Sequence, residues 1–362
     1  MKSTTTIGLD LAKEVFQVHG VDADQKATVT RALKRKDVVT FFSKLPKCLV
    51  GMEACGGAHF WARELKALGH EVKLMVPRYV KGYAKRGKND AADAAAICEA
   101  VSRRHVEEVG AKTVEQQCLL MLHKVRDGLV ATRTEKINIV RAHLLELGIA
   151  APVGQAGFEQ LLVMLRDEAC KDDAGKDDAG KDIPPLARAA LLPLVAVLDA
   201  IEQSIAGLDG NIRRAHASDE TSRRLETIPG VGMLGATAFA AVAAEAKAYK
   251  SARHYAASLG LTPRITGTGG EVELGPISKQ GNGYLRRLLY LGAVARLSWA
   301  RRNPGKADAK LLGLLKDKKF KVAAIAVANA TARTIWALLV RGGDYVANHV
   351  PTVLAARSAG CR

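Results

Sequence analysis

The sequence predicts an α/β region at the N-terminus, a long helical middle and a mainly α C-terminal region. Up to about residue 110, short apolar runs that read as strands alternate with helical patterns, which is typical of helices packed on a sheet. Apolar residues then recur at helical spacing over 113–147 and again over 186–212. Beyond about residue 220, Ala-rich helical stretches dominate. A chain of 362 residues suggests two or three domains.

The composition indicates a polyanionic partner. The chain carries 54 Lys and Arg against 37 Asp and Glu, a net charge of +17, which favours nucleic acid ahead of a membrane surface. The N-terminus is polar and strand-like, so neither a signal peptide nor a membrane span is expected. Six cysteines without a CxxC pair predict reduced thiols in a cytoplasmic protein and give no support for a zinc site.

The N-terminal region is expected to begin with a strand within residues 4–13, and residues 15–20 could pair back on it as a hairpin. Further strands are expected over 27–33, 48–54 and 72–76, with helical stretches over 36–44 and 60–68. Asp10 and Glu53 each close an apolar strand. If these two strands are parallel, both carboxylates lie at the same edge of the sheet, where ligands gather.

Two further acids, Asp90 and Asp93, are three residues apart in an Ala-rich helical stretch that Asn89 can cap. Taken singly, each acid has an ordinary structural role, as a solvated strand end or as a partner of the helix dipole. Together with Asp10 and Glu53 they form a credible cage for Mg²⁺ or Mn²⁺, because hard cations prefer oxygen ligands.

A basic run precedes this pair of acids. It consists of Lys81, Lys85, Arg86 and Lys88 and is either a solvated face or a phosphate contact beside the metal site. Lys85, Arg86 and Lys88 are the candidates for binding nucleic acid.

The middle of the chain is predicted to hold two long helices. The first, over 113–147, is basic on its polar side and could be a packing helix, a dimerisation arm or a support for nucleic acid. The second, over 186–212, is expected to pack antiparallel to the first, and Pro193 either kinks it or marks its start. Between them, the tandem repeat KDDAGKDDAGK at 171–181 is expected to be a flexible, exposed loop.

In the C-terminal region, residues 225–232 (LETIPGVG) run into a helical stretch over 235–246, a pattern typical of a helix-hairpin-helix. Such a turn exposes backbone N–H groups, so Gly230 and Gly232 are candidates for holding a DNA phosphate, although a plain helix-helix turn fits the same residues. A Gly-rich segment at 267–270 is expected to be a mobile or tightly turned loop.

Ser278 precedes a Gly-Asn turn and a basic amphipathic helix. Its hydroxyl lies close in sequence to the cations of Lys279, Arg286 and Arg287, which could stabilise the charge that develops on an attacked phosphodiester. A serine that caps a helix or binds a phosphate would fit the same position. Residues 306–347 read as helical, with 322–339 completing the core, and a loosely held end is expected beyond Pro351.

Three motifs in the N-terminal region resemble the DEDD motif of insertion-sequence transposases of family one-ten, which are relatives of the Piv DNA invertase. They are residues 8–10 (GLD), 52–54 (MEA) and 88–93 (KNDAAD). The resemblance implies an RNase H-like (RuvC-like) catalytic domain over 1–110. It also implies that Asp10, Glu53, Asp90 and Asp93 are metal ligands.

Residues 260–264 (GLTPR) and 277–289 (ISKQGNGYLRRLL) resemble the second transposase domain of the same family, which carries a catalytic serine. The resemblance matches Ser278 to that serine, with Thr268 as the alternative in the Gly-rich loop and Ser251 and Ser258 as lesser candidates. It implies a helical coiled-coil region over 111–220, a transposase domain over 221–350 and a tail over 351–362. It further implies a phosphoserine link to DNA, a dimer or tetramer, and a structured guide RNA.

The sequence therefore predicts a DNA transposase that acts on the ends of an element and on a target. Two rival functions remain open. A structure-specific nuclease resembling a junction resolvase needs the four acids but no serine. A non-catalytic helix-hairpin-helix protein binds DNA and needs neither.

Overall fold

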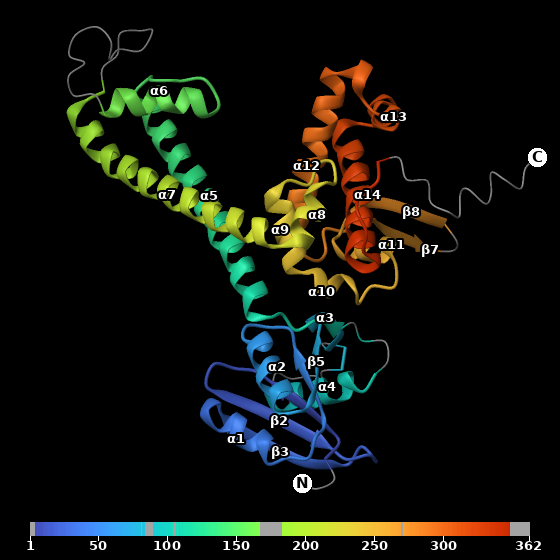
Figure 1. Cartoon of the computed structure of the whole chain (residues 1–362). Coiled ribbons are helices and arrows are strands. Elements are labelled where there is room, and N and C mark those ends of the chain that lie inside the picture. Colours follow the sequence, from blue (N-terminus) through green and yellow to red (C-terminus); the bar gives the residue numbers. More distant parts are fainter. Residues whose placement is uncertain are drawn as a thin grey trace, which may run out of the picture.

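The computed structural model describes residues 4–80, 82–83, 90–103, 106, 108–166, 183–268 and 271–347. Figure 1 shows three parts: an N-terminal sheet with its helices, an arm of two long helices, and a C-terminal group of helices with a small hairpin. Predictions for Asn89, the 171–181 repeat and the end beyond Pro351 concern residues outside these ranges.

The N-terminal part is built on a six-stranded sheet in the order β3-β2-β1-β4-β5-β6. The central strands β1, β4 and β5 run parallel, and the hairpin predicted from the first residues is present because β1 pairs antiparallel with β2. The strands are β1 (Thr6–Asp10), β2 (Val15–Val21), β3 (Ala27–Lys34), β4 (Leu49–Glu53), β5 (Glu71–Met75) and β6 (Glu108–Val109).

Helices cover both faces of this sheet. Ile7 and Leu9 of β1 pack in one core with α1 (Val38–Ser43) and α2 (Ala58–Ala67), where Trp61 meets Phe16 edge to face at 5.1 Å. The opposite face is covered by α4 (Asp90–Val101), which contacts β1, β2 and β4. Two shorter elements complete this part, the 3-10 turn η1 (Arg35–Asp37) and α3 (Pro77–Val80).

The arm consists of α5 (Val114–Glu146) and α7 (Pro185–Ser218), which pack against each other, while the first part of α5 continues beyond α7 toward the N-terminal sheet (Figure 1). Arg126 pairs with Asp209 (Nε–Oδ1 2.5 Å), and further along α5 Arg133 pairs with Glu202 (Nη1–Oε1 3.0 Å). Because the partner's number falls as the arginine's number rises, the two helices are antiparallel, as predicted. α7 runs through Pro193 without ending there.

A third helix, α6 (Gln155–Arg166), closes the far end of the arm and was not expected from the sequence. Its Phe158, Leu161 and Leu165 share a core with Leu144 of α5 and Leu198 of α7. The tip of the arm therefore has its own apolar core.

The C-terminal part packs around α14 (Phe320–Arg341), most of whose small and branched residues are buried. It differs from the prediction at two places. The expected helix over 235–246 is two helices broken at Val242. Gly267 and Thr268, expected in a mobile or tightly turned loop, lie in β7 (Pro263–Thr268), which pairs antiparallel with β8 (Glu271–Ile277). The elements are α8 (Glu220–Glu226), α9 (Met233–Ala241), α10 (Ala243–Ala246), α11 (Ala252–Ser258), β7 (Pro263–Thr268), β8 (Glu271–Ile277), α12 (Gly283–Arg302), η2 (Pro304–Lys306), α13 (Ala309–Asp317) and α14 (Phe320–Arg341).

Two helices, α7 and α14, are long and apolar enough to cross a membrane by length and composition alone, which was not expected from the sequence. This is weak support for a span, because core helices of water-soluble proteins meet the same test, and α14 lies in the C-terminal core.

Candidate functional site

Three carboxylates meet at the end of the central strands. Asp10 is the last residue of β1, and Asp90 and Asp93 lie in the first turn of α4. One oxygen from each of these three side chains lies within 4.8 Å of the others. Among the described residues, Glu53 falls outside this group, although it ends β4, the parallel neighbour of β1.

The alternation of side chains along a strand shows why these acids face one another. Gly8 and Asp10 point to the same face of the sheet, and so do Gly51 and Glu53 on the next strand. A Cβ atom on Gly8 would lie 2.1 Å from the carbonyl oxygen of Ala94, so the glycine lets the backbone of α4 rest directly on β1. Asp10 and Glu53 therefore face the side of the sheet on which α4 carries its own two acids.

The electrostatics of the cluster favour a cation. The pKa of Asp10 is raised from 3.8 to about 6, first by burial and then by the charges of Asp93, Asp90 and Glu53. Glu53 is therefore close enough to act on Asp10 although it lies outside the tight group. Asp10 and Asp93 are half-buried and Asp90 is exposed. Carboxylates that repel one another are the donor set that a hard divalent cation satisfies, so these residues fit a divalent metal.

The predicted serine lies in a tightly built turn between β8 and α12. The Ser278 N–H donates to the carbonyl of Thr262 (2.9 Å), and its Oγ accepts from the N–H of Gln280 (3.5 Å). Lys279 has φ of +55°, a left-handed conformation that costs a non-glycine residue free energy. A Cβ atom on Gly281 would lie 1.9 Å from the carbonyl oxygen of Ser258, which fixes the turn against α11.

Two of the arginines near Ser278 already bond to other groups of the protein. Arg286 Nη1 donates to the carbonyls of Leu259 (2.9 Å) and Gln280 (2.6 Å), and thereby ties the serine turn to the end of α11. Arg287 pairs with Asp127 of α5. Nucleic-acid contacts by Lys279, Arg286 and Arg287 stay predictions.

The alternative hydroxyls have local structural roles where the structure describes them. Ser251 accepts from the His254 N–H (3.2 Å) as the N-cap of α11, and Ser258 donates to the Tyr255 carbonyl (2.8 Å). Thr268 is the last residue of β7 and is paired through its backbone with Glu271.

The predicted helix-hairpin-helix turn lies between α8 and α9, and Gly230 in this turn has φ of +84°. A Cβ atom on Gly230 would lie 2.7 Å from Cδ of Arg296, whereas one on Gly232 would meet open space. Phosphate binding by Gly230 and Gly232 stays a prediction. The basic run of Lys85, Arg86 and Lys88 lies outside the described residues.

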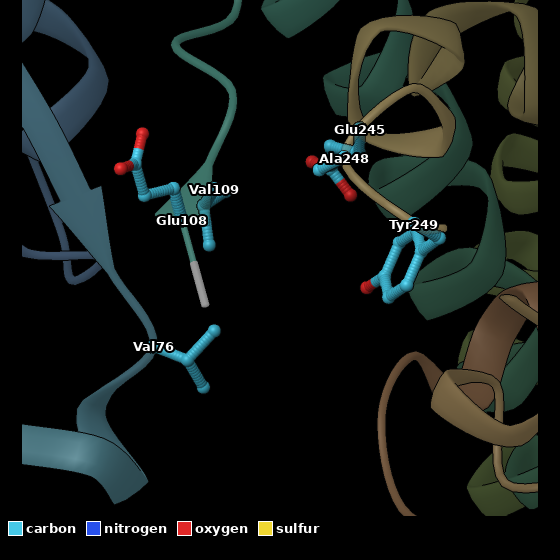
Figure 2. Close-up of a pocket in the computed structure, with 6 residues that line it drawn as sticks. All are labelled: Val76, Glu108, Val109, Glu245, Ala248 and Tyr249. Atoms are coloured by element: carbon cyan, nitrogen blue, oxygen red, sulfur yellow. The ribbon is translucent and has the colours of Figure 1, made fainter. Parts of the chain in front are cut away.

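The N-terminal and C-terminal parts meet beside these elements. Arg78 Nη1 of α3 donates to Gln280 Oε1 in the serine turn (3.2 Å), a contact across 202 residues that no local sequence signal reveals. Lys112 Nζ pairs with Glu245 Oε1 at 2.5 Å. A cavity of about 50 Å³ lies at this junction. Figure 2 shows Val76 on one side of it and Tyr249 on the other. The cavity is large enough for little more than water.

Arg264 is a further residue at the serine turn, and the sequence did not single it out as a site residue. Its Nη2 donates to the carbonyl of Ser278 (3.4 Å). Its position at the end of the GLTPR motif, directly before a Gly-rich segment, was the available signal.

Two family models match separate parts of the chain. Residues 222–308 match the model described as Transposase IS116/IS110/IS902 family. Residues 7–149 match the DEDD Tnp IS110 model, described as a transposase.

Similar proteins extend over most of the chain. A probable family 20 transposase of Pseudomonas aeruginosa is 44% identical over 342 residues, which cover 94% of this chain and 98% of that protein. A putative transposase of Sinorhizobium fredii is 40% identical over 340 residues, covering 94% and 85%. The transposase for insertion sequence element IS1328 of Yersinia enterocolitica is 35% identical over 342 residues, covering 94% and 98%.

These matches confirm the resemblance first seen in the motifs around Asp10, Glu53 and Asp90. They run through both the acidic cluster and the serine turn, and they imply cleavage and transfer of DNA strands. The chain belongs to the IS116/IS110/IS902 family of transposases.

Proposed function

We propose that this transposase excises and integrates its element with two groups: a divalent cation, Mg²⁺ or Mn²⁺, and the hydroxyl of Ser278. The cation would be held by Asp10, Asp90 and Asp93, with Glu53 as the fourth acid. The observation that carries this proposal is the meeting of three carboxylates within 4.8 Å, with the pKa of Asp10 raised to about 6.

A divalent cation bound there supplies positive charge that stabilises the extra negative charge on an attacked DNA phosphate. The role of the protein is to hold the cation in place. Asp10 and Glu53 come from rigid parallel strands, and Asp90 and Asp93 come from a helix seated on those strands by Gly8. Placing ligands on such elements is favourable because little reorganisation is needed when the phosphate arrives.

Ser278 is the proposed nucleophile. Its Oγ attacks the scissile phosphorus and a serine–phosphate ester forms as one P–O bond of the DNA strand breaks. The serine proton leaves the hydroxyl, and the departing DNA oxygen takes up a proton. Attack on the serine ester by a hydroxyl of the partner strand reverses these changes and joins the new strands, so the number of phosphodiester bonds is conserved.

The built geometry of the serine turn supports this role. The turn is held by Arg264 and Arg286 through backbone carbonyls, and Lys279 adopts a left-handed conformation directly beside the serine. A serine fixed in this way, next to cations, suits attack on an anionic phosphodiester.

The assembly and the nucleic-acid partners are also part of the proposal. The family resemblance and the long α5–α7 arm support a homo-oligomer, a dimer or a tetramer, that brings donor and target DNA together. The net charge of +17 is compatible with a structured RNA from the element as a guide to both sites. Mixing the purified protein with transcripts of the element's non-coding ends, against a scrambled RNA, tests this last point.

The experiment is strand exchange in cells on a plasmid that carries the element's ends, its flanking non-coding DNA and a target. Wild type is compared with Asp10→Ala and Ser278→Ala, and with Ser258→Ala as a control whose hydroxyl donates to Tyr255. We expect exchange and a serine-linked DNA adduct for wild type and the control, and neither for the other two.

The rival functions give different results in the same experiment. DNA cleavage that survives Ser278→Ala would favour a metal-dependent nuclease of the junction-resolving kind. If Ser278→Ala still formed an adduct with DNA, Thr268 would become the candidate nucleophile. If Asp10→Ala changed no DNA reaction, only DNA binding through the helix-hairpin-helix would remain as the function.

A further inference from the structure

A groove of about 390 Å³ lies beside the helix-hairpin-helix turn and is used by none of the steps above. It runs between the turn after α8, one face of α12 and the start of α13. Its lining is mostly apolar, with one guanidinium and one carboxylate. The residues are Pro229, Gly230, Ala295, Arg296, Trp299, Leu311 and Asp308, the last of which is the N-cap of α13.

The groove is part of the rigid fold. A Cβ atom on Gly292 of α12 would lie 1.9 Å from the carbonyl oxygen of Gly230, so the turn and the helix touch through their backbones. Two glycines are required for this approach, since Gly230 has a positive φ and Gly292 has no room for a side chain. The turn predicted to hold a DNA phosphate therefore forms one wall of the groove.

Trp299 distinguishes this groove from an ordinary surface hollow. The chain has three tryptophans, and Trp61 and Trp336 are only 4% and 6% exposed, whereas Trp299 is 46% exposed. On α12, Arg296 and Arg302 lie three residues before and after Trp299 and so flank it on the same face. A broad aromatic ring between two cations is suited to a ligand that is flat and apolar in one part and anionic in another.

We propose that the groove binds an unpaired base of single-stranded DNA, which stacks on Trp299 while Arg296 and Arg302 contact the adjoining phosphates. The volume lies within the usual range for small-ligand sites. Arg296 and Arg302 of α12 outnumber Asp308, the one carboxylate of the lining, and this local excess of positive charge favours a nucleotide over an apolar peptide or a second copy of this chain. DNA is the committed source because the family transfers DNA strands, which must be unpaired where they exchange.

The proposal goes beyond the assigned chemistry and depends on neither the metal nor the serine. The groove would let the protein bind opened DNA more tightly than intact duplex. A duplex held at the Gly230 turn presents its first unpaired base to Trp299 next to it.

The test uses the full-length protein carrying Ser278→Ala, without divalent metal, so that no strand can be cut. Its tryptophan emission is titrated with a duplex bearing an overhang of about six nucleotides, a blunt duplex of the same length, and an overhang made of RNA. Because Trp61 and Trp336 are buried, stacking should quench mainly the emission of Trp299.

We expect the DNA overhang to quench the emission and to bind roughly five- to hundredfold more tightly than the blunt duplex at equal salt. Trp299→Ala should abolish this preference, and Trp299→Phe should keep most of it, since a phenyl ring still stacks. Because both variants lack the reporting ring, the affinities of all variants are also measured by the fluorescence anisotropy of dye-labelled DNA. Leu291→Ala, exposed on the same helix but outside the groove, should behave as wild type. Unchanged blue emission from Trp61 and Trp336 shows that the variants are folded.

Equal affinity for overhang and blunt duplex, or a preference that survives Trp299→Ala, would overturn the proposal. A stronger response to the RNA overhang would overturn the choice of DNA. A protein-concentration-dependent emission change without nucleic acid would mean that a second copy covers the groove. Loss of strand exchange in Ser278→Ala bears only on the serine step, so the two proposals fail separately.

Discussion

Replacing Asp10 by Asn should stabilise the metal-free protein while removing its response to divalent metal. The carboxylate of Asp10 is half-buried among three other acids, and its pKa is raised from 3.8 to about 6. A rise of this size corresponds to about 3 kcal/mol of unfavourable charge in the folded state. Screening by water at a partly exposed site reduces the figure to ~1–2 kcal/mol. The neutral amide avoids this cost.

The pH dependence has a definite sign. Between pH 3.8 and about 6 the folded protein keeps a proton on Asp10 that the unfolded chain has released. The free energy of unfolding of metal-free wild type therefore falls as pH rises through that window, and the loss is complete above it. Asp10→Asn has no such loss, so the two proteins should be about equally stable near pH 4 and differ most above about pH 7.

Thermal unfolding measures both effects. In a chelator at about pH 7.5, Asp10→Asn should melt a few degrees higher than wild type, at about 2–4 °C per kcal/mol. Added Mg²⁺ or Mn²⁺ should raise the midpoint of wild type and leave the variant nearly unchanged, because a ligand stabilises only the state that binds it. Asp37→Asn, an exposed acid of the same region without a side-chain capping bond, should match wild type. A variant that melts lower in chelator, or gains as much from metal as wild type does, would refute the reasoning.

Three other changes test the packing around the sites. Gly8→Ala should cost ~1–3 kcal/mol and weaken the metal response, because its Cβ would lie 2.1 Å from the Ala94 carbonyl oxygen; calorimetry with and without metal checks this. Burial lowers the pKa of His123 from 6.5 to about 4, and the ring is hydrogen-bonded to the Tyr284 hydroxyl. The free energy of unfolding should therefore rise as pH rises from 4 to 6.5, because only the unfolded chain binds a proton there. His123→Leu should remove that pH dependence and lower the free energy of unfolding in urea by ~1–3 kcal/mol. Arg286→Met should reduce the yield of the serine adduct far more than it reduces the affinity for DNA, and Arg286→Lys should restore part of the adduct. An equal loss of adduct and of DNA affinity would mean that Arg286 contacts a phosphate.

The positions of Asp10 and Glu53 could be predicted because the alternation of side chains along a strand can be read from a few neighbouring residues. Asp10 and Glu53 end apolar runs, and parallel pairing places them at one edge once the sheet forms. What the sequence could not supply was the distance to Asp90 and Asp93. That distance depends on Gly8, where the absence of a side chain lets α4 approach. A glycine within a strand can equally mark a bulge or a bend, so its presence alone does not predict the close contact with a helix.

The hairpin β7-β8 escaped prediction for a different reason. Ile265, Val272 and Leu274 are about 70% exposed, so neither face of this ribbon is buried. The polar/apolar alternation in β8 covers only residues 271–274 (EVEL), the shortest run that indicates a strand. The strands exist because they pair with each other, and Gly267 and Thr268 lie in β7, paired with Val272 and Glu271, rather than in a loop. α6 was missed similarly, since its partners lie on two other helices.

The serine turn shows why residue type alone misjudges a basic cluster. From the sequence, Arg286 and Arg287 were equivalent cations beside Ser278. In the fold, Arg286 donates to the carbonyls of Leu259 and Gln280, whereas Arg287 reaches Asp127 on the long helix of the arm. Each guanidinium therefore already shapes the turn or anchors it to α5. A change at either position would reach Ser278 through the geometry of the turn, even where no phosphate contact is lost.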